Sequence, residues 1–322
     1  MFTYIIRRFL YSIPVVLVAS FVLFCMVRLT FDPSSKLVFS KDPNAIARYK
    51  EKFGLDKPIP VQYGKWLGNI LRGDWGISSR TNGSVGPMMT SALGVTIQLV
   101  FWGVLVSATL AVGLGVLSAV RQYSVFDYAA TSLSYVGVAM PPFWFGLIAI
   151  QVFIFGLKSW LRLDSPLFSF VGLHSTGRSG FNLDYLKHLF LPVLTLSVQT
   201  VAEWSRYQRA AMLDVLSADY VRTARAKGVP QRTVIFKHAL RNALIPLLTV
   251  IAVEGGLLFG GLIITERIFS IPGMGRLFLL SLETGDVYTL MAWFLVVALA
   301  VIVFNLLADL LYAVLDPRIR LS

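Results

Sequence analysis

The stretch Asp219-Tyr-Val-Arg-Thr-Ala-Arg-Ala-Lys-Gly228 is the most informative part of this chain, because it is polar and basic yet lies between two long apolar runs. The connection that contains it covers residues 207–244, far more than a chain needs to turn between two helices. Many of its residues are good helix formers. A long helical connection indicates a surface on which another protein docks. The alternative is an ordinary basic loop whose arginines contact lipid phosphates.

Within this connection, which we call the docking loop, residues Asp214 to Lys227 are expected to form one helix. It should end where Gly228 tolerates positive φ and Pro230 cannot donate a backbone hydrogen bond. A second amphipathic stretch, residues 231–242, then leads into the next apolar run.

The 3.6-residue period places Tyr220, Thr223, Ala224 and Lys227 on one side of the first helix. Small side chains at positions 223, 224 and 226 would let a partner approach the backbone, and basic ones at 222, 225 and 227 can reach acidic groups. The expected docking residues are Asp219, Tyr220, Arg222, Thr223, Ala224, Arg225, Ala226, Lys227 and Gly228.

The composition of the chain is typical of a membrane protein. Of its 322 residues, 56% are hydrophobic and only 14% are charged, against about 25% in soluble domains. The net charge of +12 could suggest nucleic acid, but the basic residues lie in short loops beside apolar runs and form no stripe with aromatics. The one cysteine, Cys25, can form no internal disulfide.

Six apolar runs are long enough to cross a bilayer, which takes about 20 residues. They are Leu10–Val27, Ala92–Val120, Tyr128–Leu157, Leu189–Arg206, Ile245–Thr265 and Leu290–Leu311. The first run is too long for the core of a signal peptide, so we expect a retained anchor in residues 1–28. An extracytoplasmic segment, residues 29–91, and a five-span core, residues 92–322, follow.

An even number of spans places both termini on one side of the membrane. Lysines and arginines divide nearly equally between the two sides, but eight of them lie between Arg206 and Arg241, against only Asp214 and Asp219. These charges favour an inside location for the docking loop, and with it both termini, and the family resemblance given below then settles the side.

The segment after the first span is predicted to hold two helices. Asp42-Pro43 is a suitable start for the first, which should end at Gly54. The second, residues 61–72, has its apolar residues at helical spacing and ends at Gly73. The segment could simply cap the bundle at the membrane surface, or it could also contact an external partner.

Several motifs occur in order along nearly the whole chain. Together they resemble the membrane subunits of bacterial ABC importers for dipeptides, oligopeptides and nickel. Within that group they resemble the B-type permease half. They are Gly54-Leu-Asp-Lys-Pro-Ile-Pro-Val-Gln-Tyr63, Trp66-Leu-Gly-Asn-Ile-Leu-Arg-Gly-Asp74, Pro142-Phe-Trp-Phe-Gly146, Tyr220 to Gly228, Ile264 to Arg276 and Asp316-Pro-Arg-Ile-Arg320. The wider family reads Glu-Ala-Ala, three residues and Gly in its docking loop. In this chain the corresponding positions are Arg222-Thr223-Ala224 and Gly228, which is similar to the pattern of peptide-type permeases.

The resemblance implies an all-α integral membrane protein with six transmembrane helices of the type I ABC-importer permease fold. It implies a plasma-membrane location and three kinds of partner: a second permease subunit, two ATPases that receive docking helices, and an external binding protein. ATP and Mg would be bound by the ATPases, and this chain would hold no cofactor. The expected cargo is a peptide, with nickel, glutathione or another small cargo as the alternative.

Polar residues inside the spans are candidates for the transport pathway. Glu254 lies in the middle of the fifth span, where a charge costs at least about 2.5 kcal/mol, so it should face protein or water. It could sense an amine or cation in the cargo, or it could be paired within the bundle. Gln98, Gln199 and Glu203 are further pathway candidates, although each could equally join two helices by hydrogen bonds.

Gly256 and Gly260 form a pair at the spacing that lets a neighbouring helix approach closely, and we expect them to serve packing. Pro141-Pro142 should kink or interrupt the third span. The three histidines are far apart without ligand spacing, and the chain has no phosphate-binding loop motif or catalytic triad pattern, so neither a metal site nor enzyme activity is expected. A stand-alone channel, or a membrane enzyme using Glu203, Glu254 or Asp309, remains the alternative from another class.

Overall fold

The computed structural model describes the chain except for Met1 and residues 33–43, 45–49, 52–54 and 316–322. The first expected outer helix, which begins at Asp42-Pro43, lies almost entirely outside the described residues. What is described is helical, with one isolated β-bridge between Ile77 and Ser84. The chain divides into two compact units.

The first unit comprises Met1–Thr96, Phe259–Ile263 and Pro272–Val303. It contains α1 (Phe2–Thr30), α3 (Ile59–Leu71), the start of α4 (Val85–Val120), α13 (Met274–Thr284) and most of α14 (Val287–Leu315). The predicted amphipathic helix at 61–72 is confirmed as α3, because its apolar face packs against Phe24 of α1 and Leu290 of α14 through Trp66 and Ile70. Burying these large side chains is the main force that fixes α3 on the spans.

The loop that follows α3 is fastened to the start of α14 by one carboxylate. Asp286 accepts hydrogen bonds from the Ser78 hydroxyl, from the Ser79 backbone N–H at 3.1 Å and from the Thr289 hydroxyl at 2.9 Å. Because Ser78, Asp286 and Thr289 are fully buried, each of these bonds replaces lost water contacts. The stretch from α3 to Ser79 is thus held against α1 and against the start of α14.

The second unit comprises Ile97–Leu258, Ile264–Ile271 and Phe304–Ser322. Its helices are α5 (Val125–Ala139), α6 (Pro142–Ile150), α7 (Leu157–Trp160), α8 (Leu183–Ser217), α9 (Asp219–Ala226), α10 (Gln231–Thr233), α11 (Leu240–Gly261) and α12 (Ile263–Ile268). Two π-helical stretches, Gln151–Gly156 and Val234–Ala239, join α6 to α7 and α10 to α11.

Helix α8 is the centre of the second unit, and both α5 and α6 pack on it. Glycines bring its neighbours very close. A side chain at Gly115 of α4 would lie 2.8 Å from the Ser205 carbonyl oxygen, and one at Gly137 of α5 would lie 2.8 Å from the Ala202 methyl group. Such close approach gives neighbouring helices extensive van der Waals contact, which holds membrane bundles together.

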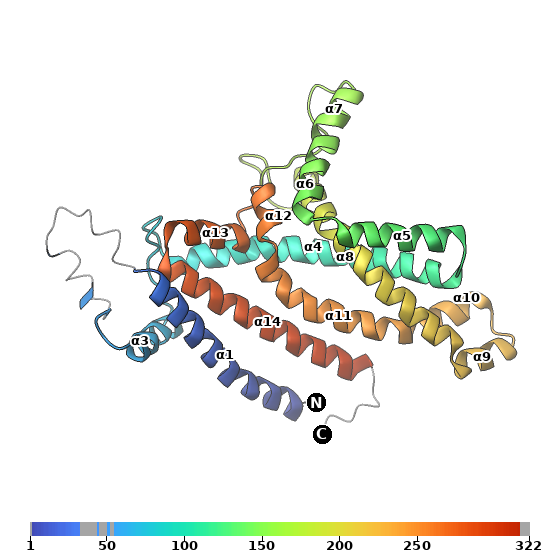
Figure 1. The fold of residues 1–322 in the computed structure, drawn as a ribbon, viewed down its shortest axis with the longest axis horizontal. Coiled ribbons are helices and arrows are strands. Elements are labelled where there is room, and N and C mark those ends of the chain that lie inside the picture. The colour runs from blue at the N-terminus through green and yellow to red at the C-terminus, as the bar shows by residue number, and fades with distance from the viewer. Residues whose placement is uncertain (1, 33–43, 45–49, 52–54, 316–322) are drawn as a thin grey trace. The chain divides into compact units, whose positions relative to one another are not determined.

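Among the described residues, five helices are long and apolar enough to cross a membrane. They are Leu10–Thr30, Val85–Val120, Pro142–Trp160, Gln231–Gly256 and Val287–Ala308. The fourth predicted run, Leu189–Arg206, does form a helix within α8, but α8 is more polar than these five. The third predicted run is interrupted, because α5 ends at Ala139 and α6 starts at Pro142 in a new direction (Figure 1). Two consecutive prolines remove the hydrogen bonds that would join the halves.

Candidate functional site

The docking loop contains a separate short helix, α9, rather than the single helix predicted from Asp214 to Lys227. Helix α8 continues to Ser217, Ala218 adopts an extended conformation with φ −68° and ψ 148°, and α9 then runs from Asp219 to Ala226. The break redirects the chain so that the apolar residues of α9 turn back towards the bundle. The prediction of one continuous helix is therefore wrong.

The inner face of α9 is a small apolar cluster. Val221 and Val234 are completely buried, Ala224 is buried with them, and the partly buried Val215 and Val229 pack against this cluster. Burying a valine side chain stabilises a structure by about 1.5–3 kcal/mol, so this cluster seats α9 firmly. It also corrects the expectation that Ala224 faces a partner together with Thr223 and Lys227, because the Ala224 side chain points into the protein.

The outer face of α9 is exposed and mainly basic. Its exposed residues are Asp219, Tyr220, Arg222, Thr223, Arg225, Ala226, Lys227 and Gly228. Arg222 lies 3.6 Å from the Asp219 carboxylate, and because both side chains are exposed this pair contributes little stability. The remaining basic side chains of this face, Arg225 and Lys227, are exposed as well.

Hydrogen bonds fix α9 at both of its ends. Gly228 has φ +75°, and the Val229 N–H donates to the Ala224 carbonyl oxygen at 3.2 Å, which closes the helix end. The Asn242 amide donates to the Tyr220 hydroxyl at 2.8 Å, linking α9 to the start of α11. The predicted break at Gly228 and Pro230 is confirmed.

A second apolar cluster connects the docking loop to the long helices. Met212 of α8 packs with Val116 of α4 and with Ile235, Ala239 and Ala243 on the other side of the loop. Val215 packs against both this cluster and the one beneath α9, so the two clusters adjoin each other.

A buried ion pair joins α5 to α8. The Arg209 guanidinium donates two hydrogen bonds of 2.7 Å to the Asp127 carboxylate, which also accepts from the Ser118 hydroxyl and the Tyr123 backbone N–H. Asp127 is only 2% exposed. The bonds from Arg209 hold the pKa of the Asp127 carboxyl well below its usual range. No local pattern could reveal this pair, since 82 positions separate its members.

Two of the predicted pathway residues come together in the structure. The Glu254 carboxylate of α11 accepts a 2.6 Å hydrogen bond from the indole N–H of Trp204, which is completely buried in α8. Glu203 lies close enough to Glu254 to interact with it electrostatically. Glu254 is thus paired within the bundle, as one of the two sequence interpretations expected, and its side chain is partly exposed.

Glu203 also lines a hollow of about 530 Å³ on the α5–α8 side of the second unit. Arg206, Tyr207 and Tyr135 line it too, and the Arg206 guanidinium lies 4.5 Å from the centre of the Tyr135 ring. Gln199 is half-buried on α8, one turn from Glu203, and Gln98 is exposed on α4.

The glycine pair in α11 is only partly described. Gly256 is buried, and the surroundings of Gly260 lie outside what the structure describes. The close approach that the sequence anticipated occurs at the neighbouring Gly255, where an added side chain would meet the Phe304 ring at 2.8 Å. Within the described residues, no His, Cys, Asp and Glu side chains cluster in threes that could hold a metal ion.

Comparison with known proteins assigns the chain to a family. A model described as "Binding-protein-dependent transport system inner membrane component" matches residues 111–321, and the corresponding N-terminal model matches residues 1–98. The oligopeptide transport system permease protein AppB of Bacillus subtilis is 40% identical over 326 residues, covering 99% of this chain and all of that protein.

Two further relatives match over their full length. The dipeptide transport system permease protein DppB of Alkalihalophilus pseudofirmus is 37% identical, covering 99% of this chain and 100% of that protein. The di/tripeptide transport system permease protein DppB of Pseudomonas aeruginosa is 35% identical, covering 99% of each chain. The chain belongs to the family of multi-pass inner-membrane components of binding-protein-dependent transport systems, and is a transport subunit without catalytic activity of its own.

Proposed function

We propose that this chain forms one half of the membrane pathway of an ATP-driven peptide importer. Its family membership implies an ATPase and a binding protein as partners. Peptide cargo is supported by the relatives, which are named oligopeptide, dipeptide and di/tripeptide permeases and match over their full length. The second half would be a homologous permease subunit, so that the pathway forms between two non-identical chains.

The observation that carries the proposal is the construction of α9. A helix of eight residues is too short to be stable alone, yet α9 is seated by Val221 and Val234 and closed by Gly228. Its outer face offers Arg222, Arg225 and Lys227 to solvent. A short helix that is fixed from behind and basic in front suits a socket with acidic groups at its rim.

Movement of this helix would drive transport. When the ATPases close on ATP, α9 would move with them. The clusters around Val221 and Met212 would then carry that movement into α8, α11 and α4. Rigid rotation of packed helices can alternate the access of a central path between the two sides of the membrane.

In this proposal, the docking loop and both termini lie in the cytoplasm and α3 lies outside. The path would pass the hollow beside Glu203, which offers a carboxylate, a guanidinium and two tyrosines to a cargo that carries both an amine and a carboxylate. Glu254 would contribute to the acidic character of this side of α8.

The role of α9 can be tested by reversing one charge. Arg225→Glu should leave the apolar seat of α9 intact, because Arg225 is exposed. We expect it to reduce the amount of ATPase subunit that copurifies with the chain and to reduce peptide uptake. Arg121→Glu, an exposed basic residue in the turn between α4 and α5, is the matched control. Equal copurification for both variants would contradict the role of α9.

A further inference from the structure

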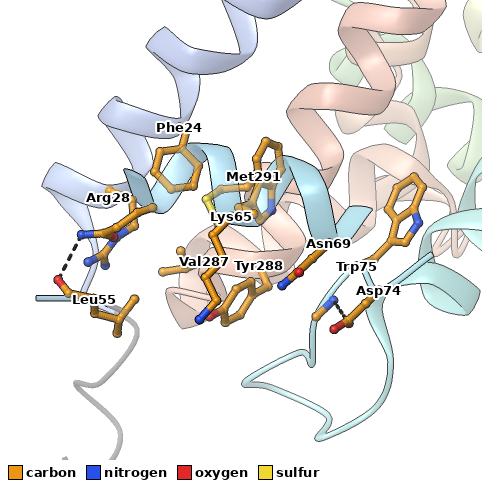
Figure 2. A pocket seen from close by; sticks show the side chains of 13 residues that line it. Phe24, Arg28, Leu55, Lys65, Asn69, Asp74, Trp75, Val287, Tyr288 and Met291 are labelled. Atoms are coloured by element: carbon orange, nitrogen blue, oxygen red, sulfur yellow. Dashed lines mark hydrogen bonds between the residues drawn. The ribbon is translucent and has the colours of Figure 1, made fainter. Parts of the chain in front are cut away.

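A small pocket in the first unit lies where α1 ends, α3 passes and α14 begins. Figure 2 shows Phe24 and Arg28 of α1, Lys65 of α3 and Tyr288 of α14 around it. The enclosed space is about 60 Å³. Sites for drug-sized ligands enclose about 300–1,000 Å³, so this pocket admits only a compact group.

The pocket lies at the level of the membrane surface. Arg28 is two residues before the end of the candidate span Leu10–Thr30, and Val287 is the first residue of the candidate span Val287–Ala308. Both helices pass from the apolar core into water at this point. Trp66 and Trp75 line the same pocket, and tryptophan and tyrosine side chains are enriched at the lipid headgroup level.

The polar lining of the pocket favours an anion. Arg28 and Lys65 supply two positive charges. The Gln62 side-chain oxygen accepts from the Arg28 Nε at 3.0 Å, while its amide donates to the Leu55 and Lys57 carbonyl oxygens. Gln62 therefore positions the guanidinium. The Asp74 carboxylate also lines the pocket and accepts from the Gly76 N–H at 3.0 Å, so the two basic groups leave one net positive charge in the lining.

Trp66, which lines the pocket, carries a buried donor without an acceptor in the part of the chain that the structure describes. Trp66 is only 7% exposed, and its indole N–H has no hydrogen-bond partner among the described residues. A buried donor left unpaired costs about 1–3 kcal/mol. An acceptor oxygen that enters between Trp66, Arg28 and Lys65 would recover that cost.

We propose that this pocket binds the phosphate of an anionic phospholipid headgroup. Arg28 and Lys65 would neutralise the phosphate, and the indole N–H of Trp66 would be brought to one of its oxygens by a small side-chain adjustment. The aromatic and aliphatic residues around it, among them Phe24 and Met291, would contact the glycerol and the first carbons of the acyl chains. Such a lipid would join α1, α3 and α14 at the membrane surface.

Lipid titration of the assembled transporter in detergent tests this proposal, with native mass spectrometry counting bound phosphatidylglycerol. We expect Lys65→Gln to weaken the tightest lipid site about fivefold, and Arg28→Gln with Lys65→Gln about 25-fold, since each basic group near a membrane surface contributes a factor of about five. Arg28→Lys with Lys65→Arg should keep the site. Arg72→Gln is the control, because Arg72 is an exposed basic residue beside α3 that does not line the pocket.

Three results would overturn the proposal. The first is phosphatidylglycerol binding by Lys65→Gln that equals wild-type binding; because Lys65 is exposed, this variant should fold normally. The second is displacement of the lipid by inorganic phosphate or glycerol phosphate at similar concentration, which would assign the site to a free phosphate. The third concerns the double variant Arg28→Gln with Lys65→Gln. If it binds lipid normally but binds the external binding protein more weakly than wild type, the pocket belongs to an acidic group of that protein.

Discussion

Gly228 offers the sharpest perturbation of the docking loop. Its φ is +75°, a conformation that costs other residues about 1–2 kcal/mol. An added methyl group would meet no heavy atom within 4 Å, so Gly228→Ala introduces backbone strain and no clash. The strain can be relieved only by changing how the chain leaves α9, which loosens the helix from its seat. Asn tolerates this conformation better than Ala, so Gly228→Asn should have a smaller effect.

A strain of about 1–2 kcal/mol corresponds to a factor of about 5–30 in an equilibrium constant. We therefore expect Gly228→Ala to weaken binding of the purified ATPase subunit to the reconstituted permease by up to that factor, with a parallel fall in peptide uptake. Gly64→Ala is the matched control. Gly64 also has open space around it, but it lies inside α3, where Ala favours the helix by up to about 1 kcal/mol.

The binding isotherm of the ATPase subunit is the measurement, and its order should be wild type and Gly64→Ala first, Gly228→Asn next and Gly228→Ala last. If Gly228→Ala binds the ATPase and transports peptide as well as Gly64→Ala does, the conformation of this turn does not set the position of α9. The reasoning from the docking loop to coupling would then be refuted.

Three further predictions concern the interior of the second unit. Asp127→Asn leaves Arg209 without its counter-charge and should lower the free energy of unfolding by about 2–4 kcal/mol. This is the lower end for buried pairs, because 26% of the Arg209 side chain is exposed. A melting temperature within 1 °C of wild type would contradict this prediction. The pKa of the Asp127 carboxyl is lowered in the folded protein, so its stabilising contribution is complete above its unfolded pKa of about 3.9 and is lost only as the pH falls below that value. The stability difference between wild type and Asp127→Asn should therefore stay constant between about pH 5 and pH 8. Glu254→Gln keeps an acceptor for the Trp204 indole and should preserve assembly. It should reduce uptake of peptides with a free amine more than uptake of N-acetylated peptides. If the variant and wild type take up the two kinds of peptide in the same ratio, the charge of Glu254 has no role.

The sequence predicted well those features that depend on local pattern. The apolar face of α3 was visible as helical spacing, and the break after α9 was visible in Gly228 and Pro230. The interruption before Pro142 was one of two outcomes that a pair of prolines allows.

Features that depend on tertiary packing were not predictable. Ser217 and Asp219 favour helix ends but do not by themselves require a break at Ala218, and the break there lets Val221 and Ala224 reach Val234. The same packing reverses the expected orientation of Ala224, since helical period gives two possible faces and only the neighbouring elements choose between them. The pairing of Asp127 with Arg209 likewise depends on how α5 packs against α8.

The measurement that most directly tests the central role of α9 is cross-linking from its exposed face. Thr223→Cys in a Cys25→Ser background leaves one thiol on the outer side of α9. We predict that this thiol cross-links to the ATPase subunit and is protected from a membrane-impermeant reagent added outside intact cells, whereas Leu71→Cys, on exposed α3, is labelled from outside. Labelling of Thr223→Cys from outside, with no cross-link to the ATPase, would contradict the account.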